Sequence, residues 1–381
     1  MEVGKFWTGV RLEVDGDNLN QVLGSRILQL VTEIRLNCWD QKATKIRTGE
    51  KIFTAIASGE VSQLRKIDHL KSNFREKARR HPLKLKDDDG RNLIHFPILQ
   101  CSPELLSQAA DRLEEINLGS CTLPTLQTRA LLAKIIDSED LKLKTLCLDG
   151  SGNRLAGVPV DILIRAAVKL EHTNIHRFLF FPEQVNTLFR TIAESPVMRM
   201  KSLDTWVYHK DLSVVSPAVL SAALVRLEEV SRAENLTQDQ LESLFKKIAS
   251  CDDMKLRRLD IYKRIDLSAV PSDTLAEAVV RLKEVNISGT NLSPDQVQNI
   301  FSSITNCPCL SLNNLDISQN DLSSVSPEIL AESISRLDTI HLHVTCLTST
   351  QVNCILNLVG RQSTRLRSFE HDDIRSNSRE V

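Results

Sequence analysis

The chain has 381 residues, of which 41% are hydrophobic and only 4% aromatic, so we predict a sizeable core that is mainly aliphatic. Lys plus Arg number 48 and Asp plus Glu number 49, and this formal net charge of −1 gives no reason to expect binding to nucleic acid or to an anionic membrane. There is no long apolar run and no basic segment followed by an apolar one at the start, so we expect neither a membrane-spanning helix nor a secretory signal.

The first third of the chain is its least regular part. Residues 12–19 begin a strand pattern, residues 31–36 fit a strand, and apolar residues at 52–56 fit a helix after it. Residues 73–92 then interrupt the pattern with cations that stand beside three aspartates. Because these acids cancel much of the field and no aromatic ring is interleaved, we interpret this segment as a solvated helix face and not as a nucleic-acid contact. Residues 1–112 are therefore interpreted as irregular N-terminal repeats.

From residue 113 onward a leucine pattern repeats about every 56 residues, which is the signature of a solenoid. Each unit starts with L-x-x-L-x-L, as in Leu282-Lys-Glu-Val285-Asn-Ile287, and its second half alternates like a strand that is buried on one face. Two unlike units alternate. One opens at Leu113, Leu170, Leu227, Leu282 and Leu337, and the other at Leu143, Met200, Leu256, Leu312 and Leu366. We predict regular repeats over residues 113–370 and a polar tail over residues 371–381.

A helix is predicted after each strand of the first unit type. Val297, Ile300, Phe301 and Ile304 are spaced i, i+3, i+4, i+7, so they form one apolar stripe on a helix. The aromatic residue of this stripe returns at equal intervals, as Phe189, Phe245 and Phe301. We expect these rings to stack in a row inside the array, where repeat-spaced aromatic residues form core.

The sequence also indicates where these helices begin. Ser293 and Thr237 are each followed three residues later by a glutamine, which is a capping box. The glutamine returns in every pair of units, as Gln127, Gln184, Gln240, Gln296 and Gln351, and we interpret it as a capping residue and not as a functional amide ladder. A proline opens the helix of the other unit type, at Pro103, Pro159, Pro217, Pro271 and Pro327.

The L-x-x-L-x-L strands and their helices, in units that alternate over about 56 residues, resemble the ribonuclease-inhibitor-like class of leucine-rich repeats. NOD-like receptor sensor domains and Ran GTPase-activating proteins belong to that class. The resemblance implies a right-handed α/β solenoid of horseshoe shape, with a parallel sheet on the concave face and helices on the convex face. The Asn of this class stands after the strand at Asn153 and Asn320, but Thr290 and Thr345 replace it in the other unit type.

The strand residues that point away from the core define the candidate site. In a strand the residue between two core positions lies on the opposite face. Reading these positions gives a surface rich in acids and amides, which we expect to be exposed on the sheet. The candidate partner-binding residues on the concave face are Glu115, Asn117, Asn174, Asp204, Glu229, Asp260, Glu284, Asn286, Asp316 and His341. Two interpretations of this surface stay open. Asp at this position is common in leucine-rich repeats in general, where it tolerates the exposed strand, and an acidic surface is also suited to a basic protein partner, whose association the acids would accelerate.

No catalytic or cofactor motif is found. The chain has no Gly-rich phosphate loop, no G-x-S-x-G and no H-E-x-x-H. His341 and His343 share a strand face, but no carboxylate or cysteine completes a metal set at a matching position, so we expect no metal and no cofactor. Nine irregularly spaced cysteines favour a reduced, cytoplasmic protein.

The sequence therefore predicts a non-catalytic scaffold that binds a protein partner through the concave face, without nucleic acid or membrane. Two alternatives follow from the resemblance alone. One is a GTPase activator of the Ran-specific type, and the other is the substrate- or ligand-sensing arm of a ubiquitin ligase or a NOD-like immune receptor. Fold alone does not decide between these functions.

Overall fold

The computed structural model describes residues 10–14, 31–36, 58, 66–69, 102–117, 125–148, 157–173, 181–204, 212–233, 235–261, 265–359, 366 and 368–370. The chain divides into two compact units. Unit 1 comprises residues 1–179 and 197–200, and unit 2 comprises residues 180–196 and 201–381. Each unit is considered by itself.

Unit 1 contains one parallel sheet whose strands follow one another in chain order, β1-β2-β3-β4-β5-β6, among the residues described. The strands are β1 (Val10–Val14), β2 (Val31–Leu36), β3 (Lys66–His69), β4 (Glu115–Asn117), β5 (Thr145–Cys147) and β6 (His172–Thr173). Its helices are α4 (Pro103–Ala110), α5 (Thr125–Asp137) and α6 (Val160–Val168). The strands predicted near the start of the chain, at residues 12–19 and 31–36, are represented by β1 and β2.

Unit 2 contains a second parallel sheet, again with strands in chain order from β7 to β13 in the described part. The strands are β7 (Ser202–Asp204), β8 (Glu229–Ser231), β9 (Arg258–Asp260), β10 (Glu284–Asn286), β11 (Asn314–Asp316), β12 (Thr339–His341) and β13 (Ser368–Glu370). The helices are α7 (Pro182–Glu194), α8 (Pro217–Leu224), α9 (Gln238–Ser250), α10 (Ser272–Arg281), α11 (Pro294–Asn306), α12 (Pro327–Ser335) and α13 (Ser349–Val359), and a short 3-10 helix, η5, covers Leu212–Val214.

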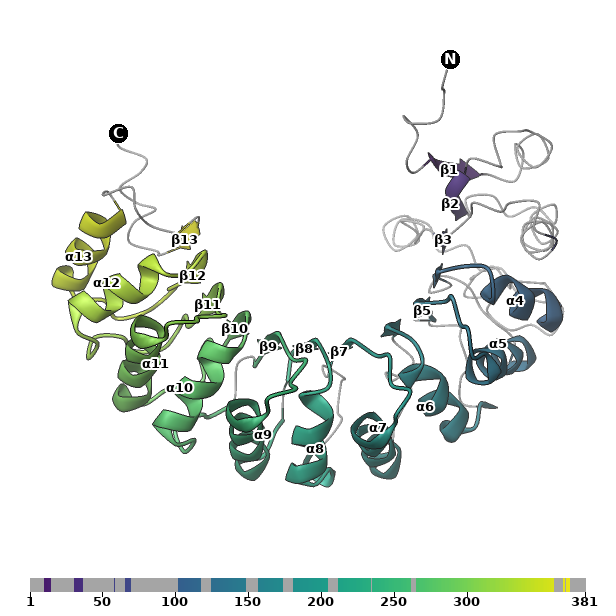
Figure 1. Cartoon of the computed structure of the whole chain (residues 1–381), viewed down its shortest axis with the longest axis horizontal. Coiled ribbons are helices and arrows are strands. Elements are labelled where there is room, and N and C mark those ends of the chain that lie inside the picture. Colours follow the sequence, from purple (N-terminus) through teal and green to yellow (C-terminus); the bar gives the residue numbers. More distant parts are fainter. Residues whose placement is uncertain are drawn as a thin grey trace, which may run out of the picture. The chain divides into compact units, whose positions relative to one another are not determined.

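The helices of unit 2 lie side by side and cover one side of its sheet, whereas the other side carries no helix of the described chain (Figure 1). Each strand pairs in parallel with the next without a shift in register. Val285 of β10, for example, is opposite Leu259 of β9 and Leu315 of β11. The regular alternation of helices with parallel strands fits a repeat α/β solenoid.

The core lies between the sheet and the helices. In β8, β9 and β11 the middle residue of the strand points into it, and Val230, Leu259 and Leu315 are 0% exposed, as the strand alternation predicted. The predicted row of rings is confirmed as buried: Phe189 is 2% exposed, and Phe245 and Phe301 are 0% exposed. The described core is therefore mainly aliphatic, with one buried aromatic residue in each of the three repeat pairs that contain α7, α9 and α11.

The predicted capping boxes are confirmed and have a second role. Ser293 Oγ accepts from the Gln296 amide at 3.3 Å, and Gln296 Oε1 accepts from the Ser293 amide at 2.8 Å. Gln296 Nε2 then donates to the carbonyls of Leu267 and Val270 in the turn before α10, both at 2.6 Å. Gln240 and Gln351 bridge their preceding turns in the same way. Each glutamine thus caps one helix and ties it to the previous unit.

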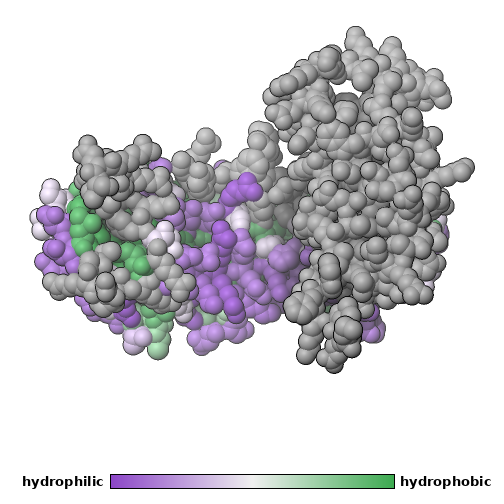
Figure 2. Space-filling view, turned by 90° about the horizontal axis from the view of Figure 1, so that it is seen from above, coloured by the Kyte–Doolittle hydropathy of each residue, from purple (hydrophilic) through white to green (hydrophobic). Residues whose placement is uncertain are grey.

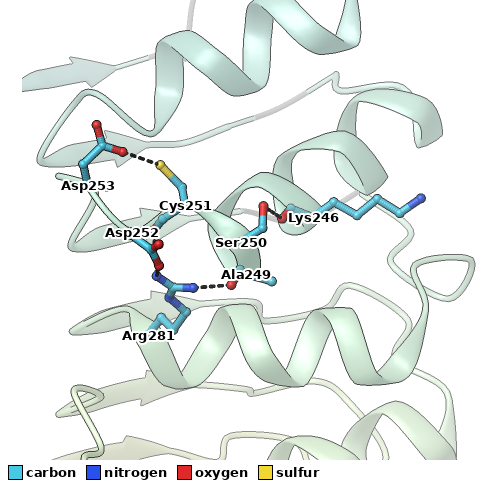
Figure 3. Close-up of polar contacts among 7 residues, drawn as sticks. All are labelled: Lys246, Ala249, Ser250, Cys251, Asp252, Asp253 and Arg281. Carbon is cyan, nitrogen blue, oxygen red and sulfur yellow. Dashed lines mark hydrogen bonds and ion pairs between the residues drawn. The ribbon is translucent and has the colours of Figure 1, made fainter.

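In four of the first-type units, the cation before the opening leucine binds the end of a helix from the preceding unit. Arg226 donates to the carbonyls of Ile192 and Ala193 at 2.7 and 2.6 Å, and to that of Ser195 at 2.7 Å. Figure 3 shows the same arrangement at the end of α9, where Arg281 contacts the Ala249 carbonyl and lies beside Asp252. A guanidinium there satisfies carbonyls that a helix end leaves without intrahelical partners. The series is Lys169, Arg226, Arg281 and Arg336.

Some predictions fall on residues outside those described. These are the helix at 52–56, the charged segment at 73–92, Asn174 and the tail at 371–381. Of the helices that are described, none is long and apolar enough to cross a membrane.

Candidate functional site

The open side of the unit 2 sheet, here called the strand face, is lined by two rows of side chains. Hydrophilic residues dominate it where it is visible between the grey atoms (Figure 2). The register places one row at the strand starts and the other at the strand ends. The start row is Ser202, Glu229, Arg258, Glu284, Asn314, Thr339 and Ser368. The end row is Ser231, Asp260, Asn286, Asp316 and His341, and the backbones of Asp204 and Glu370 take the corresponding register positions in β7 and β13.

The start row contains a cation between two acids. Arg258 lies opposite Glu229 on one side and Glu284 on the other. Its guanidinium nitrogens are 3.7 Å from Glu229 Oε1 and 3.6 Å from Glu284 Oε2. Glu229 Oε1 also accepts from Ser231 Oγ at 2.8 Å. The two glutamates are therefore half-buried and partly neutralised, whereas the sequence predicted that they would be exposed.

Two polar residues of the end row are fixed by the turns that follow their own strands. Asn286 Oδ1 accepts from the Ser288 amide, and Asp316 Oδ1 accepts from the Ser318 amide, each at 3.0 Å. Both are Asx-type turns, in which a side chain holds the backbone two residues later. Asn and Asp at this position thus have a structural use, and their second polar atoms remain on the strand face.

Asp260 is the least satisfied residue of the end row. Its Oδ1 is buried and has no hydrogen-bond partner in the described part of the chain. Burial raises the pKa of this carboxyl above its ordinary value of 3.8, and Asp316 raises it further, while Arg258 and the Arg232 amide act in the opposite direction. The ionised form is therefore kept at a cost that the fold does not fully offset.

The two histidines of β12 and its turn form a pair. The ring centroids of His341 and His343 are 6.4 Å apart, with 27° between the ring planes. Within the described residues, no group of three or more His, Cys, Asp or Glu side chains lies close enough to hold a metal ion. His341 is opposite Asp316 in the sheet register, so it extends the polar end row.

The candidate residues do not all lie on one sheet. Glu229, Asp260, Glu284, Asn286, Asp316 and His341 lie on the strand face of unit 2, and Asp204 ends β7 of the same sheet. Glu115 and Asn117 lie on β4 of unit 1, opposite Lys66 and Asp68 on one side and Thr145 and Cys147 on the other. Asn174 is not among the described residues. The site is therefore defined on unit 2 alone.

Sequence reasoning missed Arg258. Glu229 and Glu284 occupy the start-row position in the first unit type, and Arg258 occupies the same position in the second unit type. The pair Arg257-Arg258 before Leu259 was the available signal, because both residues precede a core leucine in an L-x-x-L-x-L strand. Reading one position across both unit types would have placed a cation in the middle of the acids.

Comparisons with known proteins show no family. No protein-family model and no curated protein sequence matches the chain. Among solved structures, the chain is similar to a structural-genomics crystal structure of a Bacteroides fragilis protein, with 12% sequence identity and a TM-score of 0.28. The match covers 89% of this chain and 75% of the other. At this TM-score the likeness supports no inference about function.

Proposed function

We propose that this chain is a leucine-rich-repeat solenoid of the ribonuclease-inhibitor-like class that binds a protein partner through its strand face. In this proposal the strand side is the concave side of a right-handed horseshoe and the helices form its convex side. The protein acts as a non-catalytic scaffold in the cytoplasm, and its preferred partner is basic.

The assignment to this repeat class is supported by the polar residue that follows the strands. Asn320 Oδ1 accepts from the Leu292 amide of the preceding unit at 3.1 Å, and its Nδ2 donates to the Ile287 and Ile317 carbonyls at 3.0 and 3.1 Å. The side chain thus satisfies buried backbone groups of two neighbouring units. In the other unit type the Thr290 hydroxyl binds only its own turn, through the Ile287 carbonyl at 2.8 Å.

One observation carries the proposal for function. The strand face presents two registered rows of polar side chains along the strands of unit 2, on the side that the described helices leave open. The turns account for Asn286 and Asp316 of the end row, but core packing does not account for the charges of the start row, because these side chains point away from the core. A row of half-buried charges on a continuous sheet is instead suited to recognition, in which electrostatic complementarity gives specificity and speeds association.

The acids at the strand ends favour a basic partner. Asp260 and Asp316 are separated by one intervening strand, so their backbones are about 10 Å apart. Asp260 Oδ1 lacks a partner in the described residues, and Asp316 uses only Oδ1 in its turn. Because Asp260 Oδ1 is buried, a cationic side chain from a partner would offset the charge of the two carboxylates and would not supply that atom's missing hydrogen bond.

The test is a capture experiment with a double charge reversal. The full chain is compared with Asp260→Lys/Asp316→Lys in affinity capture from cell extract, followed by mass spectrometry and by direct binding of any recovered protein after its purification. The matched control is Glu277→Lys/Glu332→Lys, which makes the same charge change at exposed positions on α10 and α12.

We expect the strand-face reversal to weaken binding of the purified partner at least about tenfold, with most of the salt dependence lost, while the helix control binds normally. Thermal unfolding of both variants checks that each remains folded, and this check matters most for Asp260→Lys because Asp260 is half-buried. A partner that binds the strand-face variant with unchanged affinity and rate would contradict the proposal.

A further inference from the structure

The guanidinium of Arg258 is held between two acids of the strand face, and these acids do not occupy all of its hydrogen-bond donors. The carboxylates of Glu229 and Glu284 flank it at 3.7 and 3.6 Å, which is longer than a charge-assisted hydrogen bond of about 2.7–2.9 Å. The side chain is 52% exposed. A guanidinium has five N–H donors in a planar fork, so Arg258 has donors to offer to a group that approaches from solvent.

Two further cations lie next to Arg258. Arg257 and Lys283 are exposed residues at the starts of neighbouring strands, joined by a bond from the Lys283 amide to the Arg257 carbonyl at 2.8 Å. Neither side chain forms an ion pair or a hydrogen bond within the described residues. Glu228 is the acid beside them in this row, since its carbonyl accepts from the Arg257 amide at 2.9 Å. We call Arg257, Arg258 and Lys283 the cationic cluster.

Other arginines of unit 2 are used by the fold. Arg226, Arg281 and Arg336 each donate to carbonyls at the end of a helix. The cationic cluster has no such internal role, and its like charges lie on adjacent strands, where they repel one another weakly. An anion placed over it would bind several donors at once, and a carboxylate matches a guanidinium in a bidentate geometry.

The surroundings of the cluster decide which anion fits. Glu228, Glu229 and Glu284 adjoin it, and the acidic end row lies further along the same strands. A polyanion such as nucleic acid would meet these acids as it covered the cations. A single carboxylate from a protein avoids that repulsion, because it occupies only the cluster.

The distance between the two charged zones of the strand face is set by strand geometry. From Arg257 to Asp260 the chain advances three residues, and at about 3.3 Å per residue this is roughly 10 Å. A partner segment in extended conformation presents every second side chain to one surface, so residues two or four positions apart, at roughly 7 or 13 Å, span a distance of this size on one face. Such a segment can therefore place one charge over each zone.

We infer that the partner segment carries an acidic side chain and a basic side chain about 10 Å apart, with the carboxylate on the cationic cluster and the cation on Asp260 and Asp316. The inference rests on the proposed use of the strand face. It adds that the partner is recognised by a pair of opposite charges, and not by positive charge alone.

The inference is tested with short synthetic peptides on an array, probed with the labelled full chain at low and at high salt. The peptides have a neutral backbone sequence with Glu two or four residues from Arg in either order, two Glu, two Arg, or neither. A spacing of three residues, which puts Glu and Arg on opposite faces of an extended chain, serves as the geometric control. The variants are Arg257→Glu/Lys283→Glu and Asp260→Lys/Asp316→Lys. Arg190→Glu, at an exposed position on α7, is the matched control.

We expect the peptides with Glu two or four residues from Arg to bind at least about fivefold more strongly than all others at low salt. Both double variants should lose this preference, and the Arg190→Glu variant should keep it. Arg258 is left intact in the variants because its removal would also free the charges of Glu229 and Glu284.

The other outcomes separate the two proposals. If the peptide with two Arg binds best and Arg257→Glu/Lys283→Glu strengthens it, the inference is wrong while a basic partner for the strand face still stands. If neither double variant changes the binding of any peptide, both proposals lose their support. Tight binding of single-stranded DNA that Arg257→Glu/Lys283→Glu abolishes would assign the cluster to a polyanion and overturn the inference.

Discussion

Gln240, Gln296 and Gln351 occupy the same place in three successive repeat pairs of unit 2, whereas the start row of the strand face changes its residue from strand to strand. Each glutamine is buried and meets the same backbone carbonyls, so the geometry of the repeat admits one residue type. On the strand face Glu229, Arg258 and Asn314 take equivalent positions with different charges. A residue that recurs at the same place in successive repeats of this chain is therefore fixed by packing. Residues that differ from strand to strand on the ordered strand face are not fixed in this way, and they are available for binding a partner.

The largest expected effect would come from breaking the repeated core. Phe245 is completely buried, and truncation of a buried ring leaves a cavity between neighbouring units. We expect Phe245→Ala to lower the free energy of unfolding by about 3–5 kcal/mol, measured by urea unfolding followed by circular dichroism. Leu126→Ala is the control, because Leu126 is 69% exposed and its truncation should cost little. A loss below about 1 kcal/mol for Phe245→Ala would contradict the stacked core.

A smaller effect is expected from the buried amide. Gln296→Ala removes the bonds to the Leu267 and Val270 carbonyls and to the Ser293 amide. The Leu267 carbonyl keeps its bond from the Val270 amide, but the other groups lose this partner, and each buried unsatisfied group costs about 1–3 kcal/mol. We expect a loss of about 2–3 kcal/mol in the same unfolding measurement.

Gln298→Ala provides the comparison on the same helix. Gln298 makes longer contacts, to Ser302 Oγ at 3.2 Å and from the Ser326 amide at 3.4 Å. We expect its removal to cost clearly less than that of Gln296. Equal losses at the two positions would mean that capping and propensity, and not the bridge between units, account for the repeated glutamine.

The sequence predicts those features of the fold that arise from a residue pattern repeated in every unit. The apolar stripe of α11, the strand alternation of β10 and the Ser293 cap each depend on residue type and spacing within one unit, and the structure confirms them. The bonds from Gln296 to the preceding turn connect residues 26 and 29 positions apart. Such contacts depend on how units stack, so they could not be derived from one unit alone.

The arginine series illustrates the same limit. Arg226, Arg281 and Arg336 stand one residue before the opening leucine of their units, and this regularity is visible in the sequence. Their targets are helix-end carbonyls of the preceding unit, which only the three-dimensional stacking brings within reach. The same is true of the candidate site, where strand register, and not spacing, places Arg258 between two acids.

The smallest expected effect concerns Asp260, a strand-face residue whose carboxylate is charged at neutral pH although it is half-buried. The folded pKa is raised above 3.8, chiefly by burial, so the folded state binds a proton more tightly than the unfolded chain. Stability linked to this group is therefore lost as the pH rises from 3.8 through the folded pKa, and at neutral pH the full cost of ionisation is present. Asn has nearly the same shape and no charge.

We therefore expect Asp260→Asn to be more stable than the natural chain at neutral pH, by less than about 1 kcal/mol because solvent screens a half-exposed charge. The difference should shrink as the pH is lowered toward 3.8, where the natural side chain is increasingly protonated, and urea unfolding over this pH range measures it. Glu277→Gln, at an exposed position on α10, should show no such trend. Such a result would support the proposed role of Asp260 in binding, because the carboxylate would then weaken the fold that carries it. If Asp260→Asn were instead less stable at neutral pH, the carboxylate would have a structural use, and the case for Asp260 as a binding residue would be lost.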